Sequence, residues 1–229
     1  MEKMPRWALI RRRLVWMPTW RGWLIGLVVL CPIFWMLFKG LHTFLTVVSP
    51  VTSDTIVVEG WAPDYAFKKA ADEFKAGHCK RIYVTGGPLE KGAPLSRYKT
   101  YAELGAAVTT AFGVDTQAVQ AVPASEVMTD RTYASARALS LFFAKQKPAT
   151  KSLNVISIGP HSRRTRLMFM KAFDPDWEIG SIPVQDENYD AAHWYRSSNG
   201  VRAVSDEFIA YLYAKLLFHP PKPQSESME

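Results

Sequence analysis

Short apolar runs alternate with amphipathic stretches between residues 55 and 218. The apolar runs are rich in β-branched residues and are bounded by turn residues, which is typical of buried strands. They predict strands at 55–58, 81–85, 119–122, 153–158 and 178–184. The stretches between them have helical periodicity and predict helices at 63–77, 98–112, 130–145, 161–173 and 201–218. Strands that alternate with helices predict an α/β domain built on a parallel sheet.

A longer apolar run precedes this domain. Residues 22–38 contain no charged side chain, and beyond Lys39 the chain stays apolar through Val48. We expect one N-terminal transmembrane helix, with the anchor and its exit over residues 22–48. A cleaved signal peptide is the alternative. The run is long for one, and the bulky residues after Pro32 leave no small-residue cleavage site.

The positive charge is concentrated before the apolar run. Residues 1–21 hold six basic residues and one acidic residue, so they carry +5 of the net charge of +7. A basic segment before the span predicts a cytoplasmic N-terminus and an extracytoplasmic domain at an inner membrane. Because the domain itself is nearly neutral, a nucleic-acid partner is not expected. The predicted parts are 1–21 cytoplasmic, 22–48 anchor, 49–219 domain and 220–229 disordered tail.

The cysteines and histidines give no cofactor prediction. Cys31 lies in the apolar run and Cys79 in the domain, so no disulfide framework is expected. The five histidines lack paired metal-ligand spacing, so no metal site is predicted. The sequence contains neither the G-x-x-x-x-G-K-[ST] loop nor the G-x-G-x-x-G fingerprint of nucleotide-binding proteins, so no cofactor is predicted.

Three predicted strands end in unusual tripeptides. These are Glu59-Gly60-Trp61, Thr85-Gly86-Gly87 and Gly159-Pro160-His161. In a parallel sheet the carboxyl ends of the strands share one edge, where ligands bind. Gly86 and Gly87 would supply backbone N–H groups to an anion, or form a plain turn. Glu59 would act as a general base, or would form an ion pair with one of the arginines that follow His161.

Basic residues gather after the fourth strand, at the predicted start of a helix. His161 is followed by Arg163, Arg164 and Arg166, although cations are unfavourable at a helix N-terminus. A bound anion would explain them; a solvated basic face is the alternative. We expect His161 to transfer protons and, beside three arginines, to favour its neutral form. Asp130 is expected to cap the helix before this strand, and Arg131 to reach the same pocket.

Several of these segments together resemble the SanA/ElyC/YdcF family of bacterial proteins over residues 54–175. The resemblance rests on Asp54-Thr-Ile-Val-Val, Thr85-Gly-Gly, Gly113-Val114, Asp130-Arg-Thr-Tyr-Ala-Ser-Ala136 and His161-x-x-Arg164. It implies a Rossmann-like, three-layer fold and, for anchored members, a role in envelope or peptidoglycan processes. The chain departs from the family at Glu59, and at Tyr133 and Ser135, where a Glu-Asn pair is common.

These expectations combine into one functional hypothesis. The protein is a membrane-anchored envelope protein whose domain binds an anionic small molecule or lipid-linked glycan at the carboxyl edge of the sheet. It hydrolyses or transfers that intermediate, with His161 and Glu59 as catalytic residues and Gly86, Gly87, Arg131, Arg163, Arg164 and Arg166 as ligand-binding residues. The alternatives are a non-catalytic scaffold or regulator of envelope assembly, and a binder of a nucleotide or S-adenosylmethionine.

Overall fold

The computed structural model describes residues 17–89 and 96–220. These divide at Lys39 and Gly40 into two compact units. The first is most of the helix α1 (Trp20–Leu45), which is long and apolar enough to cross a membrane, with a mean hydropathy of 2.2. Its 26 residues correspond to roughly 39 Å of helix. An N-terminal helix with the length and composition of a span is thus confirmed.

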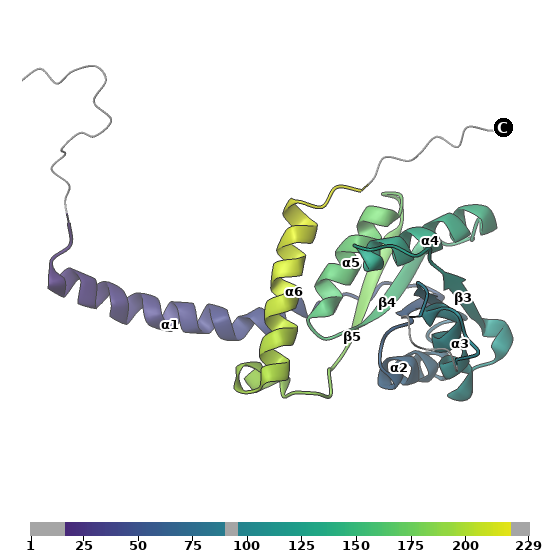
Figure 1. The fold of residues 1–229 in the computed structure, drawn as a ribbon, viewed down its shortest axis with the longest axis horizontal. Helices are drawn as coiled ribbons and strands as arrows, with labels where there is room; N and C mark the ends of the chain where they lie inside the picture. The colour runs from purple at the N-terminus through teal and green to yellow at the C-terminus, as the bar shows by residue number, and fades with distance from the viewer. Residues whose placement is uncertain (1–16, 90–95, 221–229) are drawn as a thin grey trace, which may run out of the picture. The chain divides into compact units, whose positions relative to one another are not determined.

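The second unit is built on a five-stranded parallel sheet (Figure 1). The strands are β1 (Thr55–Glu59), β2 (Arg81–Gly86), β3 (Val119–Pro123), β4 (Ser152–Ile158) and β5 (Glu178–Val184). Their spatial order is β3-β2-β1-β4-β5, and every pairing is parallel. This confirms the Rossmann-like α/β prediction. The chain reverses its direction of winding between β1 and β4, which makes their carboxyl ends the topological switch point.

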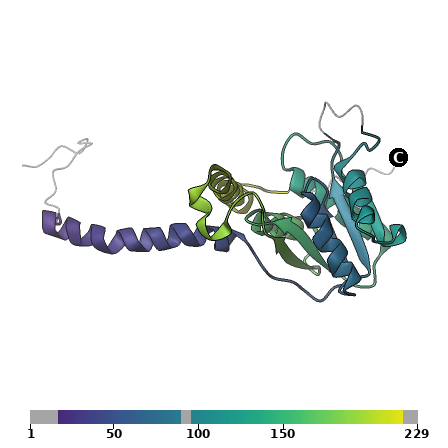
Figure 2. The same cartoon turned by 90° about the horizontal axis from the view of Figure 1, so that it is seen from below.

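Helices cover both faces of the sheet (Figures 1 and 2). One face packs against α2 (Asp64–Lys75) and α3 (Tyr101–Ala111), the other against α4 (Arg131–Gln146) and α5 (His161–Ala172). A last helix, α6 (Ser198–Leu216), packs on α5, where Ala214 and Phe218, two residues after the helix, form a cluster with Met168. Two 3-10 turns, Thr116–Ala118 and Ala191–Arg196, complete the second unit.

The core follows from the alternation of side chains along β1. Ile56 and Val58 point toward α2 and pack with Phe67, whereas Val57 points to the opposite face and joins the cluster around Phe143. All four β1 residues from Ile56 to Glu59 are buried, so both faces of the central strand are covered. A carboxylate at the end of such a strand therefore has no direct access to bulk water.

Two helix starts differ from the sequence prediction. Helix α3 begins at Tyr101 rather than at residue 98, because Thr100 and Glu103 form a reciprocal capping box. Helix α6 begins at Ser198 rather than at residue 201. Helix α5 begins at His161 as predicted, directly after Pro160, so the basic residues lie in its first two turns. Residues 1–16, residues 90–95 and the predicted tail from residue 221 lie outside the described residues.

The segment before β1 is bound to the sheet rather than forming a free linker. Ser49 pairs with Ser181 of β5, and the Asn154 side chain binds both the N–H and the C=O of Val51 at 2.8 Å. Earlier still, Leu45 is fully buried. The compact unit that starts at Gly40 therefore includes contacts that precede the predicted domain boundary at residue 49.

Candidate functional site

The switch point brings the ends of β1 and β4 together. Glu59 is the last residue of β1, and β4 is followed by Gly159 and Pro160, which lead into His161. Gly159 has φ of +37°, a conformation that permits the sharp turn into α5. As a result, His161 at the first position of α5 lies beside Glu59, although the two are separated by about a hundred residues in sequence.

A cleft with a volume of about 960 Å³ opens at this edge of the sheet. Its wall comes from the ends of β1 and β2, the segment 124–130, the first turns of α4 and α5, and one face of α6. The predicted site residues that line it are Glu59, Gly86, Gly87, Arg131, His161 and Arg164. The structure thus brings six of the eight predicted residues to one cleft.

Glu59 is almost completely buried at the floor of the cleft, with 2% of its surface exposed. Its Oε2 accepts a hydrogen bond from Thr165 (2.9 Å), whose hydroxyl also contacts that of Ser157 (3.1 Å). His161 Nε2 lies 3.2 Å from the same Oε2, at ion-pair distance but without hydrogen-bond geometry. The carboxylate is therefore held from one side only.

His161 and Arg164 share a second carboxylate, that of Glu207 on α6. Glu207 Oε1 lies 2.8 Å from His161 Nδ1 and 2.9 Å from Arg164 Nη2, and its Oε2 accepts from Arg164 Nε at 2.8 Å. Arg164 Nη2 also lies 2.9 Å from His161 Nδ1. One nitrogen cannot both donate and accept a proton, so we assign Nδ1–H as the donor to Glu207. The guanidinium then pairs bidentately with the same carboxylate.

The two carboxylates determine the charge state of His161. Burial by itself lowers the pKa of His161, but attraction to Glu59 and the hydrogen bond to Glu207 outweigh it and raise that pKa to about 9. Burial raises the pKa of both carboxyls, yet their cationic neighbours prevail: His161 above all lowers the pKa of Glu59, and Arg164 with His161 lowers that of Glu207 to about 2. All four groups are therefore charged at neutral pH.

This charge state corrects the expectation that His161 is neutral. The prediction counted three neighbouring arginines, but only Arg164 turns toward His161. Arg163 donates from Nε to the carbonyl of Phe44 and stacks on the Phe44 ring at 4.0 Å. Arg166 donates to the carbonyl of Ile179 at 2.8 Å. Neither Arg163 nor Arg166 lines the cleft, so the structure does not place them with the other predicted ligand-binding residues.

Two polar atoms at the cleft floor have no hydrogen-bond partner among the described residues. They are Oε1 of Glu59 and Nε2 of His161, on side chains that are almost entirely buried. Leaving such atoms unpaired costs free energy, and in native proteins it calls for a functional explanation. A protonated Nε2 offers one hydrogen bond to a ligand oxygen, and the free Oε1 accepts one from a hydroxyl or water. The indole of Trp61, which also lines the cleft, packs edge-on against His161 at 5.0 Å.

The first turn of α4 forms the opposite wall of the cleft. Asp130 occupies its N-cap position, as predicted, but with φ of 53° and no hydrogen bond from its side chain to the helix. The N–H groups of this turn therefore lack a side-chain cap. Arg131 follows with an exposed side chain that makes no hydrogen bond or ion pair with any described residue. An uncapped helix start with a free cation favours an anion.

The glycines after β2 differ in what the structure requires of them. A Cβ on Gly86 would come within 2.8 Å of the Tyr101 side chain, so this glycine is needed for the close approach of α3. A Cβ on Gly87 would meet nothing closer than 3.8 Å. Packing thus explains Gly86 without a ligand, whereas Gly87 remains a candidate backbone donor.

Two residues of the site were missed in the sequence. Glu207 lies on the buried face of α6 with Val204, Tyr211 and Ala214, and a carboxylate on an otherwise apolar helix face was the available signal. Thr165 follows His161 by four residues and so lies on the same face of α5. The sequence thus indicated the cations of this network and one of its acids, Glu59, but not Glu207, which pairs with Arg164.

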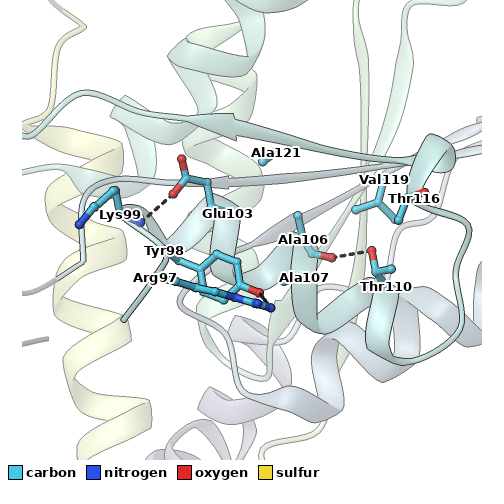
Figure 3. Close-up of a pocket in the computed structure, with 10 residues that line it drawn as sticks. All are labelled: Arg97, Tyr98, Lys99, Glu103, Ala106, Ala107, Thr110, Thr116, Val119 and Ala121. Atoms are coloured by element: carbon cyan, nitrogen blue, oxygen red, sulfur yellow. Dashed lines mark hydrogen bonds between the residues drawn. The ribbon is translucent and has the colours of Figure 1, made fainter. Parts of the chain in front are cut away.

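A second, shallower pocket of about 480 Å³ lies over α3 and β3 (Figure 3). The guanidinium of Arg97 lies over the Tyr98 ring at 4.9 Å, and Glu103 accepts from the Lys99 N–H at 2.7 Å. These groups satisfy one another, and none of the predicted site residues lies here. The cleft at the carboxyl edge is therefore the better candidate site.

Neither a search for metal sites nor comparisons with known proteins assign a function to the cleft. Among the described residues, no group of three or more His, Cys, Asp and Glu side chains is arranged to hold a metal ion. No protein-family model matches the chain, and no curated protein matches it either. The resemblance to the SanA/ElyC/YdcF family therefore stays a prediction from the sequence.

Proposed function

We propose that this protein is a membrane-anchored envelope protein, related to the SanA/ElyC/YdcF family, whose domain binds an anionic cell-envelope intermediate and hydrolyses or transfers it. One observation carries the proposal: the buried, unpartnered atoms of Glu59 and His161 lie in the same cleft as the uncapped first turn of α4. A phosphoryl or carboxylate group would pair with the free Arg131 and accept a hydrogen bond from His161.

The charge state assigns the direction of proton transfer. With a pKa of about 9, His161 carries its proton at neutral pH and acts as the acid. Its Nε2–H protonates the leaving oxygen as the bond from that oxygen to the transferred group breaks. Water, or an acceptor hydroxyl in a transfer, forms the new bond and gives its proton to Glu59.

The contact between Glu59 and His161 would also return both groups to their starting protonation states. The charged His161 lowers the pKa of Glu59. Once His161 has lost its proton, the pKa of Glu59 rises, so Glu59 becomes a stronger base for the proton of the attacking water or hydroxyl. The proton then returns from Glu59 to His161, whose Nε2 lies 3.2 Å from Oε2 and would turn into hydrogen-bond geometry for the transfer. Glu207 keeps the imidazole oriented throughout by accepting from Nδ1–H.

A binding experiment tests the anion site. We expect the detergent-solubilised full chain to bind inorganic phosphate, and Arg131→Ala to weaken binding more than tenfold, since a charge-assisted contact contributes about 1.5–3 kcal/mol. Arg137→Ala is the matched control, because Arg137 lies on the same helix and does not line the cleft. Equal affinity in the two variants would contradict the proposed anion site.

A turnover experiment separates catalysis from binding. We expect slow hydrolysis of p-nitrophenyl phosphate by the full chain, abolished in His161→Gln and retained in Arg137→Ala. The alternative function, a non-catalytic scaffold or regulator, is favoured by one observation: Arg164 and Glu207 satisfy each other without any ligand. Phosphate binding without turnover of phosphate mono- or diesters would support that alternative.

The topology belongs to the proposal as well. The basic segment before α1 supports a cytoplasmic N-terminus, and the domain would then lie outside the inner membrane. Alkaline phosphatase fused after Phe218 should be active in cells, and a green fluorescent protein fused there should stay dark. The reverse result would place the domain in the cytoplasm and argue against an envelope substrate.

A further inference from the structure

The cleft at the carboxyl edge of the sheet has a charged half and an apolar half. The charged network built on Glu59 and His161 lies at the switch point between β1 and β4. In the other half, the segments that follow β1, β2 and β3 contribute apolar side chains to the wall of the same cleft. We call these side chains the apolar rim: Trp61, Leu89, Val127 and Met128.

The segments that carry the apolar rim follow three neighbouring strands. In the order β3-β2-β1 the strand ends lie about 4.8 Å apart, so the apolar half extends over roughly 10 Å. The segments after β2 and β3 run side by side, since a Cβ on Gly87 would lie 3.8 Å from the carbonyl oxygen of Ser125. Leu89 is held in this row because its N–H donates to the carbonyl of Lys99 at 3.0 Å. The rim is therefore built by adjacent segments.

Most of the apolar rim is open to solvent. Trp61 is 46% exposed, Val127 38% and Met128 94%. Single exposed apolar residues are ordinary, but a group of them beside the polar groups of a cleft is typical of a ligand-binding groove. Methionine is unbranched and adaptable, so it packs well against irregular apolar groups. The rim thus offers an apolar surface that the described residues leave uncovered.

The apolar rim adjoins the proposed anion site at two points. Trp61 contacts His161, the proposed proton donor, with ring centroids 5.0 Å apart. Met128 precedes Arg131 by three residues, so their Cα atoms lie no more than about 11 Å apart. A phosphate bound between Arg131 and His161 would therefore have its ester substituent within reach of the rim.

We propose that the ligand of the cleft is amphiphilic, namely the phosphate ester of an aliphatic alcohol. Its phosphate lies at Arg131 and His161, and its chain lies along the apolar rim. The inference rests on the proposed function, of which it names the substrate class. It also assigns a role to the rim, which selects for the chain, whereas the charged half binds the phosphate.

The side chains of the rim favour an aliphatic chain over a sugar. Val127 has no hydrogen-bonding group in its side chain, and the thioether of Met128 is only a weak acceptor. Sugar hydroxyls packed against these side chains would lose water without gaining partners. The same wall also carries the polar side chains of Ser125, Glu126 and Thr129, which would suit a sugar. A sugar phosphate is therefore the alternative ligand that the test includes.

Binding of four phosphates to the full chain tests the proposal. The chain is held in amphipol, and calorimetry measures Kd for inorganic phosphate, ethyl phosphate, hexyl phosphate and glucose 1-phosphate. Each fully buried methylene raises affinity roughly fourfold. Hexyl phosphate should therefore bind at least about tenfold more tightly than ethyl phosphate, even when only half of its additional methylenes are buried.

A double variant shows whether the rim is responsible. Val127→Ser combined with Met128→Ser removes exposed apolar surface and leaves the charged groups in place. We expect it to lose the advantage of hexyl phosphate and to keep the parent's affinity for inorganic phosphate. Met170→Ser is the matched control, because Met170 is 51% exposed on α5 and does not line the cleft. Thermal melting checks that all variants are folded.

The outcomes separate this inference from the proposed function. Equal affinity of the parent chain for ethyl and hexyl phosphate would overturn the amphiphilic ligand and leave the anion site intact. An advantage of hexyl phosphate that persists in the double variant would also overturn it, because partition into the amphipol would then explain the advantage. Tighter binding of glucose 1-phosphate than of hexyl phosphate would make the ligand a sugar phosphate. If none of the four phosphates binds, the proposed function is contradicted as well.

Discussion

Charged side chains are exposed at one edge of the parallel sheet and buried at the other. At the amino edge, ion pairs such as Lys80–Asp54 lie before the strands, with 77% and 53% of the two side chains exposed. At the carboxyl edge, Glu59, His161, Arg164 and Glu207 are each less than 20% exposed. Exposed pairs contribute little to stability, whereas a buried charge is tolerated only with partners. The difference shows that charges at the carboxyl edge depend on one another, whereas those at the amino edge are stabilised by solvent.

The largest expected effect comes from removing the shared carboxylate. Glu207→Ala leaves Arg164 and His161 buried without their partner, so the free energy of unfolding should fall by about 3–5 kcal/mol. Denaturation of the full chain in detergent, followed by circular dichroism, measures this loss. A change comparable with that of an exposed acid would show that the network is solvated and that the two edges do not differ.

A second prediction concerns how the carboxyl edge is supported by the chain before the domain. Leu45 is fully buried, and its carbonyl accepts from Ser162 in the first turn of α5. Leu45→Ala should therefore cost about 2–4 kcal/mol through the cavity it leaves. Val48→Ala is the control, since Val48 is 74% exposed. Equal stabilities for the two variants would mean that the domain boundary lies after Leu45.

The third prediction is a pH dependence of stability. His161 has a folded pKa of about 9, above its ordinary 6.5, so its contribution is complete below pH 6.5 and is lost as the pH rises through 9. We expect a loss on the order of 3 kcal/mol over this window. His161→Gln should flatten the profile there. Glu59, Glu207, Arg164 and Asp130 are the charged groups around the network, and Arg164 stays charged throughout.

The smallest effect is expected at the amino edge. Lys80→Ala removes an exposed pair with Asp54, and the unfolding midpoint should remain that of the parent chain. High salt should change the parent and the variant equally, because exposed charges are already screened. A clear destabilisation by Lys80→Ala would remove the contrast between the two edges.

Local patterns were sufficient for most of the fold. Periodicity predicted the five strands in their correct places, and the turn residues placed Glu59, Gly86 and His161 at one edge, because parallel strands share their carboxyl edge. Helix boundaries were less exact, since the capping box at Thr100 decides where α3 begins. The charge-free run at 22–38 was sufficient to identify α1, because length and hydropathy are properties of composition.

What only the tertiary structure decided is the pairing of the charges. The sequence shows four basic residues within six positions. It does not show that two of them, Arg163 and Arg166, bind backbone carbonyls outside the cleft. Nor did the sequence show that Glu207, more than forty residues later, neutralises Arg164 and keeps His161 charged. Pairing of this kind depends on how α6 packs on α5. The sequence therefore determined which groups reach the cleft, and packing determined their charge and the direction in which protons can move.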